Sequence, residues 1–146
     1  MKVVIQRVKD AVLKIENKVE CEIGKGLVCF VGFCETDDES KLDFIIKRIS
    51  GLRVFEDENG KMNLNPEQIG ASFMLVSNFT LYGDLKDGFR PSFIKAMRPE
   101  IAKPLYYKFV EKFKQKTNLP VVSGVFGADM QITQTNDGPI TLILEN

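Results

Sequence analysis

Residues 1–32 read MKVVIQRVKDAVLKIENKVECEIGKGLVCFVG, and their pattern decides the fold class. Apolar residues recur with a period of two through residues 3–8, 12–15 and 19–23. This period is typical of strands that bury one face. Because turn residues follow the second and third runs, at Asn17-Lys18 and Gly24-Lys25-Gly26, the stretch predicts an antiparallel meander.

Two later segments carry a helical period instead. From 37 to 51 one face of a helix would hold apolar residues, with acidic residues in the first turn and Lys47-Arg48 near the end. Residues 99–116 predict a second helix, in which we expect Pro104 to cause a kink or a restart. These two segments are the main helices of the chain.

The remaining periodic segments predict strands. Asn59-Gly60 lies between two short apolar runs and indicates a hairpin, and a further strand is expected over 72–81. We also expect 130–135 and 140–144 to pair across residues 136–139. The last strand is apolar on both faces, which is unusual for a strand with water on one side. Something must cover its second face, and a second subunit is one candidate.

Size and composition favour one domain, residues 1–146, of the α+β class. The chain has 44% apolar and 27% charged residues, which is ordinary for a globular protein that needs neither metal nor disulfide to fold. It has no histidine, which excludes Ser-His-Asp and Cys-His catalysis and most catalytic zinc sites. The three cysteines form no CxxC pair, so neither a disulfide framework nor a zinc knuckle is indicated.

No apolar run approaches the ~20 residues of a membrane helix, and the first residues lack the apolar middle of a signal peptide. We therefore expect a cytoplasmic protein without a membrane partner. The net charge is zero, yet the segment Lys86–Lys116 holds nine basic residues against three acidic ones. This segment is either a docking site for a phosphate-bearing partner or a solvated, lysine-rich helix face.

Three motifs stand in order along the chain: Ser77-Asn78-Phe79-Thr80-Leu81, Gly88-Phe89-Arg90-Pro91-Ser92-Phe93 and Asn136-Asp137-Gly138-Pro139-Ile140-Thr141. Each alone is explained by strand or turn chemistry. Together, and with the opening residues 1–8 and the segment 124–130, they resemble the D-aminoacyl-tRNA deacylase family over essentially the whole chain. The chain departs from the family at Asn78, where glutamine is usual and one methylene longer.

The resemblance implies a fold in which antiparallel β-sheets curl into a barrel-like core with two main helices packed outside, assembled as a homodimer. It implies a hydrolase that cleaves the ester between a D-amino acid and the 3′-terminal adenosine of tRNA. Mischarged glycyl-tRNA is a candidate second substrate. No cofactor, no metal and no DNA partner are expected.

The resemblance also assigns residues to the site. Ser77, Asn78, Phe79 and Thr80 are the expected catalytic residues, with the backbone amide of Phe79 holding the substrate carbonyl. The expected substrate-binding residues are Arg90, Phe126, Met130, Gly138 and Pro139. Main-chain oxygens of 125–130 are candidates for holding the α-amino group. The Gly138-Pro139 bond is expected to be cis and to reach into the other subunit's site, where its carbonyls exclude L-aminoacyl substrates.

Chemistry without histidine is feasible for an aminoacyl ester, which is already labile. A well-placed donor to the developing oxyanion gives roughly 10²–10³ in rate, and the neighbouring ribose 2′-hydroxyl can assist. Thr80 as a covalent nucleophile is the alternative, but it would need an adjacent base. A different class of function is a non-catalytic RNA or small-ligand binding module that uses Lys86–Lys116. A metal-dependent esterase is disfavoured because histidine is missing.

Overall fold

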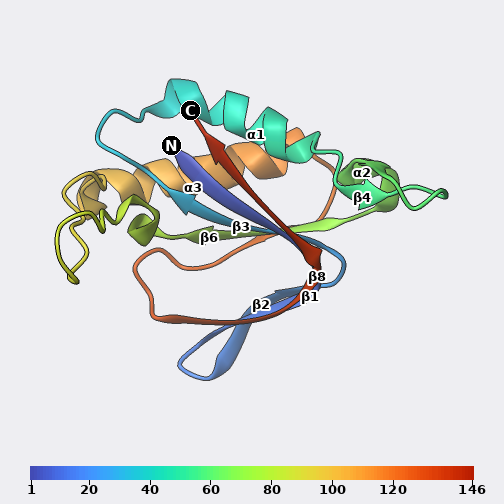
Figure 1. Ribbon diagram of the computed structural model, residues 1–146, viewed down its shortest axis with the longest axis horizontal. Helices are drawn as coiled ribbons and strands as arrows, with labels where there is room; N and C mark the ends of the chain where they lie inside the picture. Colours follow the sequence, from blue (N-terminus) through green and yellow to red (C-terminus); the bar gives the residue numbers. More distant parts are fainter.

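A computed structural model describes all of residues 1–146 and shows a mixed, six-stranded sheet that curls nearly into a barrel (Figure 1). Helices α1 (Leu42–Ser50) and α3 (Pro99–Lys116) lie together on one face of this sheet. The expected α+β class and two packed main helices are therefore confirmed. The strands are β1 (Lys2–Ile15), β2 (Lys18–Ile23), β3 (Gly26–Gly32), β6 (Ser72–Ser77), β7 (Val121–Ser123) and β8 (Met130–Glu145).

Strand β1 lies at the centre of the antiparallel part of the sheet. Its second half pairs with β2 and its first half with β3, and the register is continuous from Lys2 to Leu13, with Ala11 opposite Ile23 and Val8 opposite Gly26. Strands β2 and β3 therefore follow one another along the same edge of β1. The expected meander is wrong at this point, because Gly24-Lys25 interrupts the strand without reversing it.

The glycine at position 26 has a packing role rather than a turn role. A Cβ atom added there would collide with the carbonyl oxygen of Ser72 on β6. Strand β6 pairs parallel with β3 from Gly26 to Val31, and β7 pairs parallel with β6. The sheet is therefore mixed: the expected antiparallel pairings are joined by two parallel ones, which the long helical connections between the strands allow.

The expected strand over 72–81 is shorter in the structure. Strand β6 ends at Ser77, and residues 79–82 form the 3-10 helix η2 (Phe79–Tyr82). The amide of Asn78 still donates to the Val31 carbonyl at 2.8 Å, but beyond it the chain turns, with Gly83 donating to Thr80 at 2.9 Å. The turn places residues 77–79 at the end of the sheet rather than within it.

The C-terminal hairpin expected across residues 136–139 does not form. Strand β8 is one strand whose two halves both pair antiparallel with β1, from Ile15 opposite Met130 to Lys2 opposite Glu145. The register shifts twice, between Gln6 and Asp10 on β1, so residues 137–140 form a bulge in a continuous strand. Turn-type residues here distort a strand because β1 is long enough to pair with both halves.

The helical segments agree with the sequence in position. Helix α1 follows the short 3-10 helix η1 (Glu39–Lys41), and α3 runs without a break through Pro104, so a restart of the helix there is wrong. Pro104 is exposed, while Tyr106, Phe109 and Phe113 are buried on the inner face and hold the helix against the sheet. The smaller elements are β4 (Phe55–Glu56), β5 (Met62–Leu64) and α2 (Pro66–Ile69), and β4 and β5 form the expected hairpin.

The main core lies between the sheet and the two helices and contains 22 buried residues. Tyr106, Phe73, Phe109 and Phe113 are among its largest members, and the rings of Phe73 and Phe113 meet edge to face. All three cysteines are free thiols, of which Cys29 is buried. None of the helices has the length and apolar character that crossing a membrane requires.

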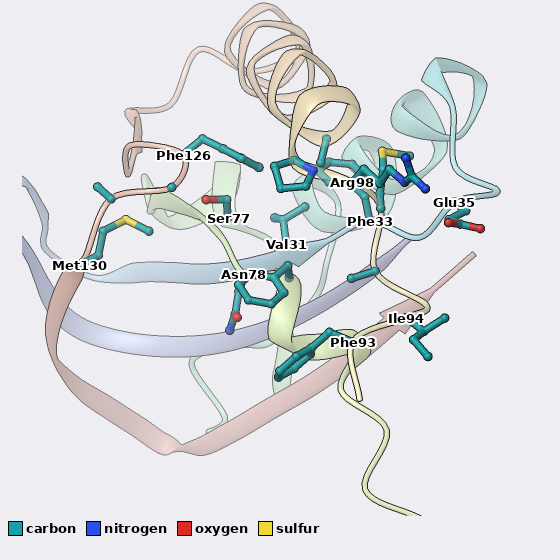
Figure 2. A pocket seen from close by; sticks show the side chains of 17 residues that line it. Val31, Phe33, Glu35, Ser77, Asn78, Phe93, Ile94, Arg98, Phe126 and Met130 are labelled. Atoms are coloured by element: carbon teal, nitrogen blue, oxygen red, sulfur yellow. The ribbon is translucent and has the colours of Figure 1, made fainter. Parts of the chain in front are cut away.

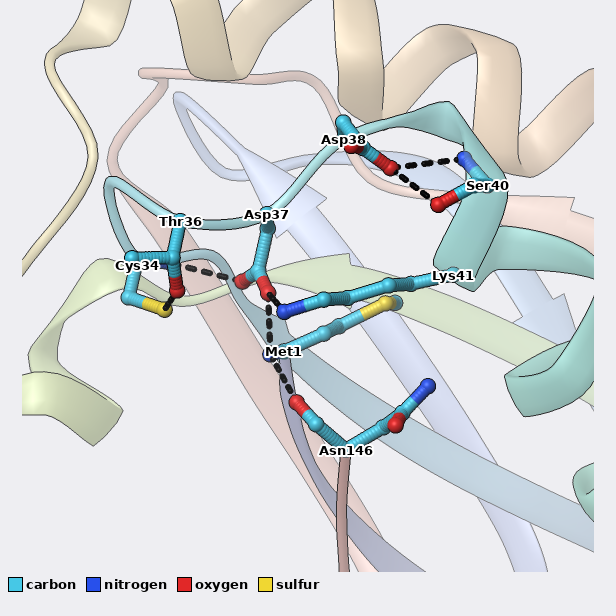
Figure 3. A network of polar contacts seen from close by, with 8 residues as sticks. All are labelled: Met1, Cys34, Thr36, Asp37, Asp38, Ser40, Lys41 and Asn146. Atoms are coloured by element: carbon cyan, nitrogen blue, oxygen red, sulfur yellow. Dashed lines mark hydrogen bonds and ion pairs between the residues drawn. The ribbon is translucent and has the colours of Figure 1, made fainter.

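The two ends of the chain meet beside α1 (Figure 3). The ammonium group of Met1 donates to the carboxylate of Asp37 at 2.6 Å and to the main-chain oxygen of Asn146 at 2.9 Å. The same carboxylate accepts from Lys41 at 2.9 Å and from the Cys34 amide at 2.8 Å. The Asp37 side chain is only 1% exposed, so this is a buried ion pair.

Candidate active site

A cavity of about 690 Å³ lies where β3 and β6 end beneath the start of α3 (Figure 2). Three segments contribute most of its lining, namely 77–79, 93–99 and 126–130. Most of the lining is apolar, and Glu35 and Arg98 are its only charged residues. A cavity of this size with few polar groups is typical of a small-molecule or cofactor site.

The first wall consists of Ser77, Asn78 and Phe79, three of the four expected catalytic residues. The parallel pairing of β6 with β3 fixes this wall, because Ser77 lies opposite Val31. Gly32 makes the close approach possible, since a Cβ atom there would lie 3.0 Å from the Asn78 carbonyl oxygen. The strand end therefore delivers a serine hydroxyl, an amide side chain and a main-chain turn to one edge of the cavity.

Thr80, the fourth expected catalytic residue, does not line the cavity. Its hydroxyl donates to the side-chain oxygen of Asn78 at 2.5 Å. No lysine or carboxylate forms a hydrogen bond with this hydroxyl, so it has no partner that could act as a base. The contact orients the side-chain amide of Asn78.

The second wall is the loop between β7 and β8, which brings Phe126 and Met130 to the cavity as expected. The Phe126 amide donates to the Tyr107 hydroxyl at 3.2 Å, which ties the loop to α3. Gly127 has a φ of 79°, a left-handed conformation that favours glycine. The two motifs that lie far apart in sequence, 77–79 and 126–130, thus face one another across one cavity.

The third wall, formed by residues 93–99, was only partly anticipated. Phe93 belongs to the second sequence motif, and its ring packs edge to face on Phe79 with centroids 5.1 Å apart. Met97 and Arg98 come from the turn just before α3, and Glu35 follows β3. The only sequence signal for Arg98 is its place directly before the first helical residue, Pro99, which does not by itself predict a cavity.

The other expected substrate-binding residues lie elsewhere. Arg90 is in the exposed loop that the bridge between Asp84 and Ser92 closes, outside the cavity. Gly138 and Pro139 are in the exposed bulge of β8 and do not line the cavity of their own chain. The bond between them is cis, as expected.

Arg7 binds the β8 bulge through Asp137, a role that the sequence did not predict. Its side chain is 4% exposed and donates to the Asp137 carbonyl at 3.1 Å and the Val54 carbonyl at 2.7 Å. It also forms ion pairs with the carboxylates of Asp137, at 3.2 Å, and Glu56, at 3.5 Å. A buried arginine in a strand of alternating apolar residues is the one available signal for such a role.

The Lys86–Lys116 segment is less basic in three dimensions than in sequence. Lys95 pairs with Asp84, Lys108 with Glu39, and Lys112 with Asp43 at 3.0 Å. Three of the nine basic residues of the segment are therefore in ion pairs, two of them on α3, and the other six form none. No group of three or more carboxylate or thiol side chains comes together as a set of metal ligands.

Two groups near the cavity have shifted pKa values. Burial raises the pKa of the Tyr106 phenol above its ordinary value, so this hydroxyl stays neutral. Burial also acts to raise the pKa of the Cys34 thiol, but hydrogen bonds with Thr36 and Tyr82 outweigh it and lower the pKa. Neither group lines the cavity.

Comparisons with known proteins agree with this arrangement. Residues 4–145 match the family described as D-Tyr-tRNA(Tyr) deacylase. A D-aminoacyl-tRNA deacylase of Limosilactobacillus reuteri is 48% identical over 145 residues, which covers 99% of both chains. One of Porphyromonas gingivalis is 45% identical over 145 residues, covering 99% of this chain and 97% of its own.

Solved structures share the fold. A protein named c-Myc DNA Unwinding Element Binding Protein is 34% identical, with a TM-score of 0.94 over 100% of this chain and 99% of its own. A probable eukaryotic D-amino acid tRNA deacylase, 17% identical, superposes with a TM-score of 0.83 over 98% and 97% of the two chains. Since the family match and the close relatives span nearly the whole chain, this protein belongs to the D-Tyr-tRNA(Tyr) deacylase family, whose members here are named D-aminoacyl-tRNA deacylases.

Proposed function

We propose that the protein hydrolyses the ester bond between a D-amino acid and the 3′-terminal adenosine of tRNA, releasing free D-amino acid and tRNA. The observation that carries this proposal is the single cavity that joins the 77–79 wall to the 126–130 wall. Family membership and relatives named for this activity support it. In translation this reaction is a form of proofreading.

The apolar cavity would take the amino-acid side chain, and the polar edge at Ser77, Asn78 and Phe79 would face the ester. Water attacks the carbonyl carbon, the acyl carbon–oxygen bond breaks, and the ribose 3′ oxygen takes up a proton. The Phe79 amide stabilises the developing oxyanion, and the substrate's own 2′-hydroxyl assists. Main-chain oxygens of the segment 125–130 would accept from the α-ammonium group.

Thr80 acts as an orienting residue in this proposal. Its hydroxyl proton points to the Asn78 side chain at 2.5 Å and no base is bonded to it, which favours orientation over nucleophilic attack. Asn78 then presents its amide from a fixed position, although it is one methylene shorter than the glutamine usual in the family.

The chiral selectivity requires a second subunit. Gly138 and Pro139 are exposed and outside the cavity of their own chain, which supports a role in the cavity of a partner. There, their main-chain oxygens would occupy the space that an L side chain needs. Glycine has no side chain, so glycyl-tRNA would be a second, slower substrate. Arg90, exposed outside the cavity, would contact the tRNA rather than the amino acid.

The surface of the last strand supports the homodimer. Leu142 is 40% exposed and Ile143 is 67% exposed, so the apolar residues predicted to need a cover lie open in the single chain. Light scattering at micromolar concentration should give about twice the mass of the chain, as a symmetric dimer requires. A stable and fully active monomer would contradict the shared site.

The decisive assay incubates the protein with matched D-tyrosyl-tRNA, L-tyrosyl-tRNA and glycyl-tRNA, with a chelator present in a parallel series. We expect rapid release of D-tyrosine, slow release of glycine and negligible release of L-tyrosine, with no effect of the chelator. A binding module would leave D-tyrosyl-tRNA intact, and a metal-dependent esterase would stop with the chelator.

A matched pair of variants isolates the proposed oxyanion donor. Phe79→Pro removes the main-chain N–H at the first position of a 3-10 helix, where proline is tolerated, and Phe79→Ala removes only the ring. The proline variant should be slower than the alanine variant by roughly 10²–10³. Equal rates would assign the oxyanion to another donor.

The cytoplasm, where aminoacyl-tRNA is used, is the proposed compartment, and the absence of a DNA partner stays a prediction.

A further inference from the structure

Tyr106 is a fully buried polar side chain that the proposed mechanism does not use. It lies in the middle of α3, is 0% exposed and does not line the cavity. Its hydroxyl lies 2.9 Å from the Leu75 carbonyl oxygen and 3.3 Å from that of Gly124. Phenylalanine would fill the same volume without a buried polar atom, so the hydroxyl calls for an explanation beyond packing.

The two oxygens that Tyr106 contacts are the points from which two walls of the cavity begin. Leu75 lies two residues before Ser77 on β6, and Gly124 lies two residues before Phe126 in the opposite wall. The Gly124 amide donates to the same Leu75 oxygen at 2.9 Å, where the pairing of β6 with β7 ends. The Tyr106 hydroxyl therefore sits at the junction where the chain leaves the sheet to form the second wall.

The ring of Tyr106 supports the same wall. Its centroid lies 6.0 Å from that of Phe126, which lines the cavity. Because burial keeps the phenol neutral by raising its pKa, the hydroxyl remains a donor throughout the working pH range. The Tyr106 side chain thus contacts Leu75, which precedes the 77–79 wall, and Gly124 and Phe126, which lie before and in the 126–130 wall.

We propose that Tyr106 is a positioning residue for the deacylation reaction: its hydroxyl fixes the spacing between the 77–79 and 126–130 walls. This inference rests on the proposed function of the cavity. The reacting ester must lie between the Phe79 amide on one wall and the oxygens that hold the α-ammonium group on the other. A change of about 1 Å in such a spacing costs roughly 100-fold in rate.

The test is Tyr106→Phe, which removes only the hydroxyl. With D-tyrosyl-tRNA we expect kcat to fall by roughly 10- to 100-fold. KM should stay within about threefold, because contacts to the rest of the tRNA, which dominate its binding, are untouched. A loss that appeared in KM alone, or a kcat equal to that of the wild type, would overturn the inference.

Phe109→Leu is the matched control on the same helix. Phe109 is as fully buried as Tyr106, does not line the cavity and carries no polar atom, and leucine fills most of its volume. Its kcat should stay within about threefold of the wild type. An equal fall in both variants would indicate a general weakening of α3 and would overturn a specific role for Tyr106.

A third variant covers the case in which Tyr106→Phe does not fold. A methyl group added by Gly124→Ala would lie 2.5 Å from the Met130 sulfur and 3.0 Å from Leu13, so the Met130 side chain must shift within the second wall while Tyr106 stays intact. It should reproduce the fall in kcat, and a wild-type kcat in the folded variant would overturn the inference. A wild-type protein inactive on every D-aminoacyl-tRNA would instead overturn the proposed function.

Discussion

Asp37→Asn tests the buried ion pair at the meeting point of the chain ends (Figure 3). The carboxylate is 1% exposed and accepts from the Met1 ammonium group, from Lys41 and from the Cys34 amide, all within 2.9 Å. Asparagine keeps the shape of the side chain but removes its charge. It also turns one acceptor atom into a donor that faces other donors.

The expected loss follows from which partners can recover. Removing one member of a buried ion pair costs about 3–5 kcal/mol, because the other charge is left uncompensated. Met1 keeps the Asn146 oxygen at 2.9 Å, and Lys41, 27% exposed, can turn to water. We therefore expect the lower end, about 3 kcal/mol. At about 2–4 °C per kcal/mol for a domain near this size, Tm falls by about 6–12 °C.

The control is Asp38→Asn, on the neighbouring residue. Asp38 is exposed and caps η1 by accepting from the Ser40 amide at 2.8 Å, a role that asparagine performs equally well. Urea unfolding should place this variant within about 0.5 kcal/mol of the wild type. If Asp37→Asn lost less than about 1 kcal/mol, or no more than the control, the ion pair would not stabilise the fold as argued.

The pH dependence of the free energy of unfolding gives a second test of the Asp37 ion pair. Burial alone would raise the pKa of Asp37, but hydrogen bonds from the Met1 ammonium, the Cys34 amide and Lys41 outweigh it and lower the pKa. A group whose folded pKa lies below its unfolded value of about 4 stabilises the fold above that value. This stabilisation is lost as the pH falls through the folded pKa. The difference between wild type and Asp37→Asn should therefore be constant from pH 5 to 7 and begin to shrink below about pH 4. A difference that was the same at about pH 5 and about pH 3 would contradict it.

Three further substitutions test features described above. Gly26→Ala should lower the free energy of unfolding in urea by about 1–3 kcal/mol, because its methyl group would collide with the β6 backbone. Gly24→Ala is the control and should change stability little, because its methyl group would meet open space. Equal stabilities of the two variants would contradict the close approach of Gly26 to β6. Arg7→Lys should lower the free energy of unfolding by at least about 2 kcal/mol, because lysine cannot bind both the Val54 and the Asp137 carbonyls, an arrangement that we call the Arg7 clamp. An unfolding midpoint equal to that of the wild type would contradict this role of Arg7. Thr80→Ala should lose less than the roughly 10⁴-fold in kcat expected for a nucleophile, and a trapped aminoacyl-threonine would reverse the assignment.

The elements that sequence predicted well are those whose signal is local. These signals depend on residues only a few positions apart in the chain. They are the helical periods of 37–51 and 99–116 and the Asn59-Gly60 turn, and each element forms where expected. The restart at Pro104 does not occur, because the inner face of α3 packs against the sheet on both sides of Pro104, which lies on the exposed face. Local patterns could not include that contact.

The larger errors concern pairings between distant residues. Asn136-Asp137-Gly138-Pro139 has the composition of a hairpin turn, but whether it reverses the chain depends on β1, about 130 residues earlier, being long enough to pair with both halves of β8. Likewise Gly26 was interpreted as a turn residue because its neighbour on β6 is invisible to a local pattern.

The candidate site divides in the same way. Its two motif walls, at 77–79 and 126–130, could be named from the sequence because the family resemblance covers them. Arg98 and Tyr106 could not, since their roles depend on where α3 packs over the sheet. The sequence thus identified the segments that line the cavity better than the residues whose place depends on the packing of α3.

The Arg7 clamp makes the region around it sensitive to chain length more than to side-chain identity. Its two closest hydrogen bonds go to main-chain oxygens, those of Val54 and Asp137, which any residue at those positions would supply. Replacing the Val54 side chain leaves its carbonyl in place, whereas inserting or deleting one residue next to Val54 or in the β8 bulge would carry an oxygen out of reach. Libraries built to alter this face should therefore vary residue types and keep both segments at their present length.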